Sequence, residues 1–169
     1  MQAIIGIMKK QFVTYYNSPL GIMEIKGNDA FITEVNFVKE EYESSADLPE
    51  NILECKKELE EYFAGKRKTF SVKLKAEGTA FQKKVWKQLL KIKFGDTTSY
   101  LNVSKDLGDV KAIRAVGHAN GKNPIAIIVP CHRVIGSDGK LTGYAGGLWR
   151  KQWLLEHEGN ISGNNPTLF

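Results

Sequence analysis

The 169-residue sequence lacks any long hydrophobic run. Its longest uninterrupted apolar stretch is the five residues from Ile125 to Val129, whereas a membrane-spanning helix needs about 20 such residues. Residues 1–10 carry their lysines after a short apolar patch and show no convincing cleavage site, so they do not resemble a signal peptide. These absences predict a cytoplasmic protein that does not enter a membrane. The length predicts one ordinary domain or two small ones.

Cysteine and histidine are scarce. The chain has two cysteines and three histidines, and it contains no Cys-x-x-Cys or His-x-x-x-His pair. Structural zinc sites use four ligands at short paired spacings, so we expect no metal, and nothing else in the sequence indicates a cofactor. A chain of this length builds a core without a disulfide, so both cysteines are expected to be reduced. Cys55 falls on the apolar side of a predicted helix, which favours a small core residue.

Acidic residues become scarce in the second half of the chain. Residues 1–78 hold 11 Lys and Arg against 13 Asp and Glu, whereas residues 79–169 hold 13 against 6. The net charge is therefore −2 in the first part and +7 in the second. Such a basic half favours nucleic-acid binding, because clustered Lys and Arg release counterions from a phosphate backbone. An ordinary solvated, lysine-rich surface is the alternative.

The first part of the chain predicts an α/β domain with a small antiparallel sheet. Alternating apolar residues at 12–16, 22–25 and 31–37, separated by turn sequences, indicate a three-stranded meander. From Pro49 the spacing becomes helical, and Gly65 is well placed to end that helix. Residues 66–78 alternate again, which favours one more strand before the next unit. We therefore predict a scaffold domain over residues 1–78 and a second domain over residues 79–169.

The second part predicts a mostly helical domain. Thr79 and Gln82 have the spacing of a capping box, and the helix they begin has an apolar face made of Phe81, Val85, Trp86, Leu89 and Leu90. Ser99 is placed to cap a short helix that Gly108 ends, and Asp109 to cap another. In this last helix an inward face is predicted for Ala112, Ala115, Val116 and Ala119, and an outward one for Lys111, Arg114 and His118. The pair is a helix-turn-helix candidate, although any helical hairpin gives the same pattern.

Cys131 follows the apolar residues 125–129 and precedes His132 and Arg133. A reactive cysteine needs a base or cation that favours the thiolate, and His132 and Arg133 are the candidates. A cysteine hydrolase would need a base and an orienting group, for which His132 or His157 with Glu156 or Glu158 are the candidates. Sequence adjacency alone does not establish contact between Cys131 and His132. The residues favour a reactive nucleophile at Cys131, and three other readings are a zinc ligand, which the spacings disfavour, a cysteine hydrolase, and a buried structural cysteine.

A glycine-rich stretch at 143–147 follows the cysteine, and a helix is predicted over 148–157. Small residues leave space for a flat ligand and expose backbone donors and acceptors. The alternative is an ordinary glycine-rich loop.

These segments carry a specific resemblance. Pro130–Gly136, with Arg114–Gly117 and Asn123–Pro124 before it and Gly143–Leu148 after it, resembles the O6-alkylguanine-DNA alkyltransferase family. The match covers residues 79–159 in detail and the first half only in layout. It implies a DNA repair protein that transfers an alkyl group, such as methyl, from O6 of guanine in double-stranded DNA irreversibly to its own cysteine. It also implies a monomer that acts once.

The resemblance assigns roles to residues of the reactive site. Cys131 is implied to be the alkyl acceptor and His132 a base that acts through water. Glu158 is implied to orient that histidine, Tyr100 to donate to guanine N3, and Asn123 to brace the turn that holds the cysteine. Because Cys131 is present, the chain does not resemble the alkyltransferase-like proteins, in which tryptophan replaces the cysteine.

The resemblance also assigns DNA and base contacts. The second short helix is implied to enter the minor groove, with Arg114 filling the gap left by the flipped nucleotide, and further DNA contacts are implied for Ala115, Lys111 and Ser99. The base pocket is implied to include Val134, Tyr144, Ala145 and Gly146. Ala145 stands where some members have serine, and the zinc ligands found in the N-terminal domain of some animal members have no counterpart here.

Overall fold

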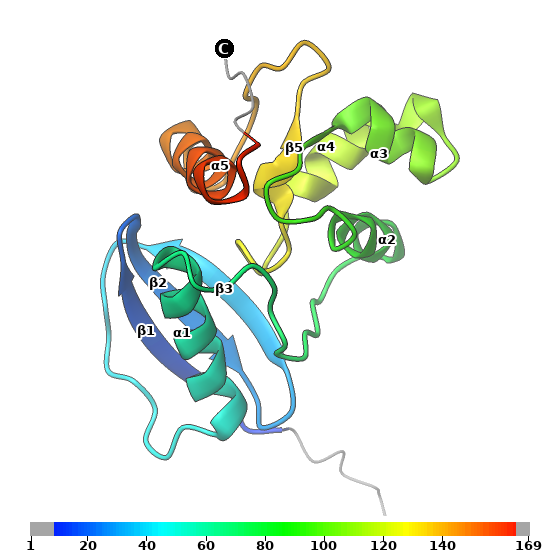
Figure 1. Cartoon of the computed structure of the whole chain (residues 1–169). Coiled ribbons are helices and arrows are strands. Elements are labelled where there is room, and N and C mark those ends of the chain that lie inside the picture. Colours follow the sequence, from blue (N-terminus) through cyan, green and yellow to red (C-terminus); the bar gives the residue numbers. More distant parts are fainter. Residues whose placement is uncertain (1–8, 165–169) are drawn as a thin grey trace, which may run out of the picture.

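The computed structural model describes residues 9–164. Most of the N-terminal segment that we compared with a signal peptide, residues 1–8, lies outside the described residues. Figure 1 shows a small sheet with one helix across it, and a group of helices beside it. This arrangement confirms the predicted fold class, an α/β N-terminal part followed by a mostly helical part.

The N-terminal sheet is an antiparallel meander of β1 (Phe12–Ser18), β2 (Gly21–Gly27) and β3 (Ile32–Val38). Helix α1 (Glu50–Phe63) packs across the sheet and contacts all three strands. Its buried face includes Ile52, Cys55 and Leu59, which belong to the same core as Met23 and Ile25 of β2. Cys55 is fully buried and free, as predicted, and its burial raises the pKa of the thiol to about 12, with a further contribution from the charge of Glu58.

The outer edge of β3, which no other strand of the sheet covers, pairs with two later segments of the chain. Ile32 pairs with Leu74 in a single parallel bridge, and Val35 pairs with Ile125 in another. The strand predicted within residues 66–78 is therefore wrong beyond the one bridging position. Ile32 N donates a hydrogen bond to Lys73 O, and Lys75 N donates one to Ile32 O. The segment then leaves the sheet toward the next helix. The edge of β3 is shared between this segment and the chain just before Cys131.

The helical part begins with α2 (Ala80–Leu89), and the capping box between Thr79 and Gln82 is formed as predicted. Val85, Trp86 and Leu89 of this helix are buried, but Phe81 is 37% and Leu90 is 50% exposed. The apolar face is therefore narrower than the sequence predicts. Trp86 Nε1 donates to Ala119 O at 2.8 Å, which fixes α2 against the helix that carries Ala119.

A pair of short helices follows. β4 (Thr98–Ser99) leads into α3 (Tyr100–Asp106), where Ser99 Oγ accepts a hydrogen bond from Asn102 N as the predicted cap. Asp109 also caps as predicted, but it caps a 3-10 turn, η1 (Val110–Ala112), before α4 (Ile113–Gly121) begins. Ala115 is exposed, so its predicted inward position is wrong. The buried residues of α4 are Val116, Ala119 and Asn120, so its inward face is centred on these positions and Ala115 lies at the exposed margin of that face.

The chain ends with η2 (Cys131–Arg133), β5 (Val134–Ile135), which pairs in parallel with β4, and α5 (Leu148–Ser162). Helix α5 extends five residues beyond the predicted end at His157 and continues past Glu158. Its buried residues recur at helical spacing, and two of them, Lys151 and Glu158, are charged. No helix among the described residues is long and apolar enough to cross a membrane.

Candidate active site

The turn before Cys131 is tightly built. Residues 125 and 127–129 are buried, as predicted for this segment, and Ala126 is half-buried, but the segment forms a turn in which Val129 N donates to Ile125 O at 3.0 Å. Ile127 has a φ of 71°, a left-handed conformation that strains a β-branched residue. Asn123 supports both ends of this turn, because its Oδ1 accepts from Ile125 N at 2.9 Å and its Nδ2 donates to Val129 O at 2.8 Å. A strained backbone is therefore held in place directly before the cysteine.

Cys131 lies on η2 and is only 6% exposed. Its carbonyl accepts a hydrogen bond from Asn120 Nδ2 at 3.3 Å. Burial raises the pKa of the Cys131 thiol, while a hydrogen bond from Asn123 and the positive charge of Lys151 act in the opposite direction. At neutral pH the thiol is therefore protonated, and an attack by sulfur needs a group that accepts the proton.

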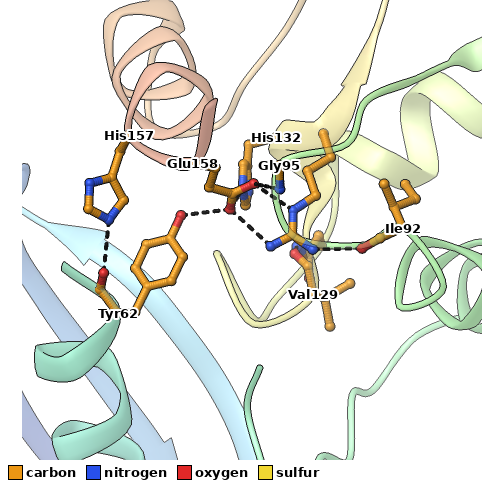
Figure 2. A network of polar contacts seen from close by, with 9 residues as sticks. Tyr62, Ile92, Gly95, Val129, His132, His157 and Glu158 are labelled. Carbon is orange, nitrogen blue, oxygen red and sulfur yellow. Dashed lines mark hydrogen bonds and ion pairs between the residues drawn. The ribbon is translucent and has the colours of Figure 1, made fainter. Parts of the chain in front are cut away.

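A buried polar network centred on the carboxylate of Glu158 includes the side chains of the two residues that follow Cys131 in the chain (Figure 2). Oε1 accepts from His132 Nε2 at 2.7 Å, Tyr62 Oη at 2.8 Å and Arg133 Nη2 at 2.9 Å. Oε2 accepts from Arg133 Nε at 2.9 Å and from Gly95 N at 3.2 Å. The predicted pairing of His132 with Glu158 is therefore present, and His157 instead contacts Tyr62 O at 2.8 Å.

The charges of this network decide which nitrogen of His132 can act as a base. Burial alone raises the pKa of Glu158, but the charges and hydrogen bonds of His132 and Arg133 outweigh it, so the pKa lies below its usual range. Burial lowers the pKa of His132 despite the nearby carboxylate. With Nε2–H donated to an ionised Glu158, a neutral imidazole has its lone pair on Nδ1. That nitrogen is buried and has no hydrogen-bond partner within residues 9–164.

Lys151 is a buried ammonium that sequence reasoning did not identify. Its side chain is fully buried, and Nζ donates to Thr142 O at 2.9 Å and lies 3.4 Å from both Gly143 O and Tyr100 Oη. Burial lowers the pKa of Lys151 to about 8. The sequence contains one indication that Lys151 is buried. Residues 151, 154, 155 and 158 share one face of a helix, so the charged Lys151 and Glu158 lie at the two ends of the face that carries the apolar Leu154 and Leu155.

Tyr100 lies at the start of α3, and its hydroxyl donates to Thr142 O at 2.9 Å. Burial raises the pKa of Tyr100, so its hydroxyl keeps its proton at neutral pH. The hydroxyl of Tyr144 is buried without a hydrogen-bond partner among the described residues, and burial likewise raises its pKa. Both tyrosines are therefore proton donors rather than bases.

Two cavities meet at the glycine-rich loop. A small one of about 80 Å³ contains Cys131, and a wider cleft of about 510 Å³ lies against Tyr100, Ile113 and Gly117. The residues shared by both are Gly121, Gly143, Tyr144 and Ala145. Of the predicted pocket residues, Tyr144 and Ala145 line both cavities and Gly146 lines the smaller one. Val134 lines neither cavity, and the contact that the resemblance implies for it is made by its backbone carbonyl, which would accept from the guanine amino group; this contact stays a prediction.

The residues predicted to contact DNA lie on the outside of the short helices. Lys111, Arg114 and Ala115 are exposed, and Ser99 is half-buried at the start of α3. Arg114 follows directly after Ile113, which lines the wider cleft. The outward surface of α4 and the opening of the cleft are therefore adjacent.

Two family models match the chain. The DNA binding domain of 6-O-methylguanine DNA methyltransferase matches residues 80–160, and the ribonuclease-like domain of the same protein matches residues 12–76. The chain belongs to this methyltransferase family. The resemblance found in the sequence is thereby confirmed at the level of the family.

Individual members of the methyltransferase family agree over nearly the whole chain. The chain is 48% identical over 154 residues to the methylated-DNA--protein-cysteine methyltransferase of Methanosarcina acetivorans, covering 88% of this chain and 99% of that protein. The crystal structure of Mycobacterium tuberculosis O6-methylguanine methyltransferase is similar with a TM-score of 0.81 and 44% identity, covering 90% and 94% of the two chains. A structure of Mycobacterium tuberculosis OGT in complex with DNA is similar with a TM-score of 0.80 and 44% identity, covering 88% and 93%.

Proposed function

We propose that this protein repairs DNA by transferring the alkyl group, such as methyl, from O6 of guanine to the sulfur of Cys131, and that each molecule acts once. The observation that carries the proposal is the position of Cys131 in a small cavity, followed directly in the chain by a histidine whose Nε2 is held by an ionised carboxylate. The wider cleft beside it has room for a base. Membership of the methyltransferase family, whose members include methylated-DNA--protein-cysteine methyltransferases, supports the same activity.

The first step is removal of the thiol proton. His132 Nδ1 accepts it, either directly or through one water molecule, and the imidazolium that forms is stabilised by Glu158 at 2.7 Å from Nε2. Arg133 and Tyr62 hold that carboxylate in place through three further hydrogen bonds. The ammonium of Lys151 favours the thiolate. Together these groups offset the effect of burial on the thiol.

The second step is a displacement at the alkyl carbon. The Cys131 thiolate attacks that carbon, a carbon–sulfur bond forms, and the carbon–oxygen bond to O6 breaks with its electron pair remaining on guanine. A hydrogen bond from the Tyr100 hydroxyl to N3 stabilises the guanine anion as it leaves, and solvent protonates the base after release. The product is a thioether, and the reaction as proposed supplies no nucleophile that would remove the alkyl group from its sulfur. The thiol is therefore not regenerated, and each protein molecule reacts once.

The substrate is double-stranded DNA, and the target nucleotide must leave the base stack before its O6 substituent can reach Cys131. We propose that α3 and α4 act as a helix-turn-helix, with α4 in the minor groove. There the small, exposed Ala115 permits close approach of α4 to the DNA, and Arg114 fills the gap left by the flipped base. Lys111 and Ser99 contact the DNA backbone. The net charge of +7 in residues 79–169 supports this surface.

We further propose that the protein acts as a monomer in the cytoplasm, in two domains over residues 1–78 and 79–169. A monomer suffices because one chain supplies every side chain of the candidate site. Two free, buried cysteines suit a reducing compartment. The reaction as proposed uses no metal and no cofactor.

The test is the intact mass of the protein after incubation with a duplex that contains O6-methylguanine. The proposal expects a gain of one methylene per protein molecule, and no gain for Cys131→Ala. Tight lesion binding without a mass change would instead identify a lesion sensor. Turnover of esters or amides without alkylation would identify a cysteine hydrolase.

A further inference from the structure

The small cavity around Cys131 is closed partly by the N-terminal sheet. Asn36 and Phe37 of β3 line it, together with residues of the cysteine turn and of the glycine-rich loop. The wider cleft, where a base has room, includes no residue of the sheet. The two parts of the chain therefore contribute to different regions of the candidate site.

Strand β3 is fixed relative to the cysteine turn by backbone hydrogen bonds. Val35 N donates to Pro124 O, and Ala126 N donates to Val35 O, both at 2.9 Å. Phe37 lies two residues beyond Val35 in the strand, so the two side chains point to the same face of the sheet. The position of the Phe37 ring is thereby tied to the residues that position Cys131.

Arg150 fixes the ring from the other side. Its guanidinium stacks on the rings of Phe37 and Trp149, at 4.5 Å from each centroid, and it donates to Leu20 O at 2.8 Å and Gly146 O at 2.6 Å. A Cβ added to Gly146 would lie 3.0 Å from Phe37 Cδ2, so the ring packs directly against the glycine-rich loop. Phe37 therefore has little freedom to move away from the cavity.

We propose that Phe37 limits the size of the O6 substituents that Cys131 accepts at full rate. This inference rests on the proposed function. When the alkyl carbon approaches the sulfur of Cys131, the remainder of the substituent occupies the small cavity, which Asn36 and Phe37 of β3 help to line. A cavity of about 80 Å³ holds several heavy atoms, since a single water needs only roughly 10–15 Å³ on this measure. Methyl and short alkyl groups fit freely, whereas a benzyl group meets the Phe37 ring and is transferred at a lower but measurable rate.

The experiment compares two duplexes, one with O6-methylguanine and one with O6-benzylguanine, by the rate at which the intact mass of the protein increases. The ratio of the benzyl rate to the methyl rate is the measured quantity. We expect Phe37→Ala to raise this ratio by about tenfold or more, because a few heavy atoms in an apolar pocket change discrimination by this amount. Phe37→Leu, which retains more of the apolar contact, is expected to raise it less.

Trp149→Ala is the matched control. Trp149 stacks on the same guanidinium at the same 4.5 Å, but it does not line the cavity and is 58% exposed. We expect this variant to leave the ratio unchanged. An equal rise in Trp149→Ala would assign the effect to a loosened Arg150 and would overturn the role of Phe37.

The two proposals fail in different ways. If the unmodified protein gains no mass from O6-methylguanine, the proposed function is wrong. If it is methylated but both Phe37 variants keep the parent ratio, only the size limit is wrong. Thermal melting of each variant establishes that its rates come from folded protein.

Discussion

Tyr62 donates its hydroxyl hydrogen to Glu158 Oε1 at 2.8 Å, the same oxygen that accepts from His132 Nε2 at 2.7 Å. Tyr62 lies in α1 and is fully buried, so the N-terminal part of the chain helps to orient the carboxylate of the candidate site. Together with the hydrogen bonds between β3 and the cysteine turn, this contact makes the N-terminal part a support for the reactive site.

The network around Glu158 gives the first prediction. Tyr62→Phe removes one hydrogen bond to a charged acceptor and is expected to lower the free energy of unfolding by about 1.5–3 kcal/mol. Its alkylation rate should fall only modestly, because His132 keeps its partner. Glu158→Gln is expected to lower the rate far more, since the imidazolium loses its stabilising charge. Denaturant unfolding and reaction rates with free O6-benzylguanine measure both effects, and equal rates in the two variants would contradict the assigned role of Glu158.

Cys131 gives the second prediction. Cys131→Ala is expected to abolish alkyl transfer and to retain DNA binding, because the removed sulfur is the acceptor and not part of the DNA surface. Intact mass and duplex binding measure the two properties separately. A parallel loss of binding would indicate that the cysteine is structural.

Much of the local structure could be predicted from the sequence because it depends on near neighbours. The caps at Ser99 and Asp109 and the capping box of Thr79 and Gln82 are formed as expected. The pairing of His132 with Glu158, expected from the resemblance, is also present. In contrast, the apolar run at 125–129 gives no sign of the left-handed Ile127, which depends on support from Asn123.

The contacts that the sequence did not reveal are those made by tertiary packing. Tyr62 and Glu158 are 96 residues apart, and no local pattern pairs them. Phe37 has the sequence signature of an ordinary strand residue, and only the alignment of β3 with the cysteine turn places it at the cavity. The alternation at residues 70–74 predicted a strand, but the single edge position at Ile32 accommodates only one bridge.

The third prediction concerns acidic pH. Burial lowers the pKa of His132 below its usual 6.5, so the imidazole remains neutral at pH 7 and can accept the thiol proton. As pH falls through that lowered pKa, His132 becomes protonated and the base is lost. We expect the rate with free O6-benzylguanine to be level between pH 6.5 and 7.5 and to decline only in more acidic solution. A loss of rate on acidification that is centred above pH 6.5 would contradict this assignment.

The fourth prediction separates DNA handling from chemistry. Arg114→Ala is expected to slow the reaction with duplex DNA far more than the reaction with free O6-benzylguanine, because a free base does not need to be flipped. Lys57→Ala is the matched control, since Lys57 is an exposed cation on α1, away from α4. Rates with both substrates are measured by intact mass, and equal losses on duplex and free base in Arg114→Ala would exclude the proposed role of this arginine.

The last prediction concerns Lys151, whose ammonium lies near Tyr100 Oη and favours the Cys131 thiolate. Its pKa of about 8 means that the charge is lost as pH rises through 8, while the raised pKa of Cys131 keeps the thiol protonated over the same range. We therefore expect the reaction with free O6-benzylguanine to slow as pH rises from 7.5 to 9. In Lys151→Met the rate at pH 7 should be lower by about tenfold, as expected for the loss of about 1.4 kcal/mol of transition-state stabilisation, and the decline above pH 8 should be absent.

Lys140→Met, at an exposed lysine before the same glycine-rich loop, should keep both the rate and the decline. A decline that persists in Lys151→Met would assign the alkaline titration to another group.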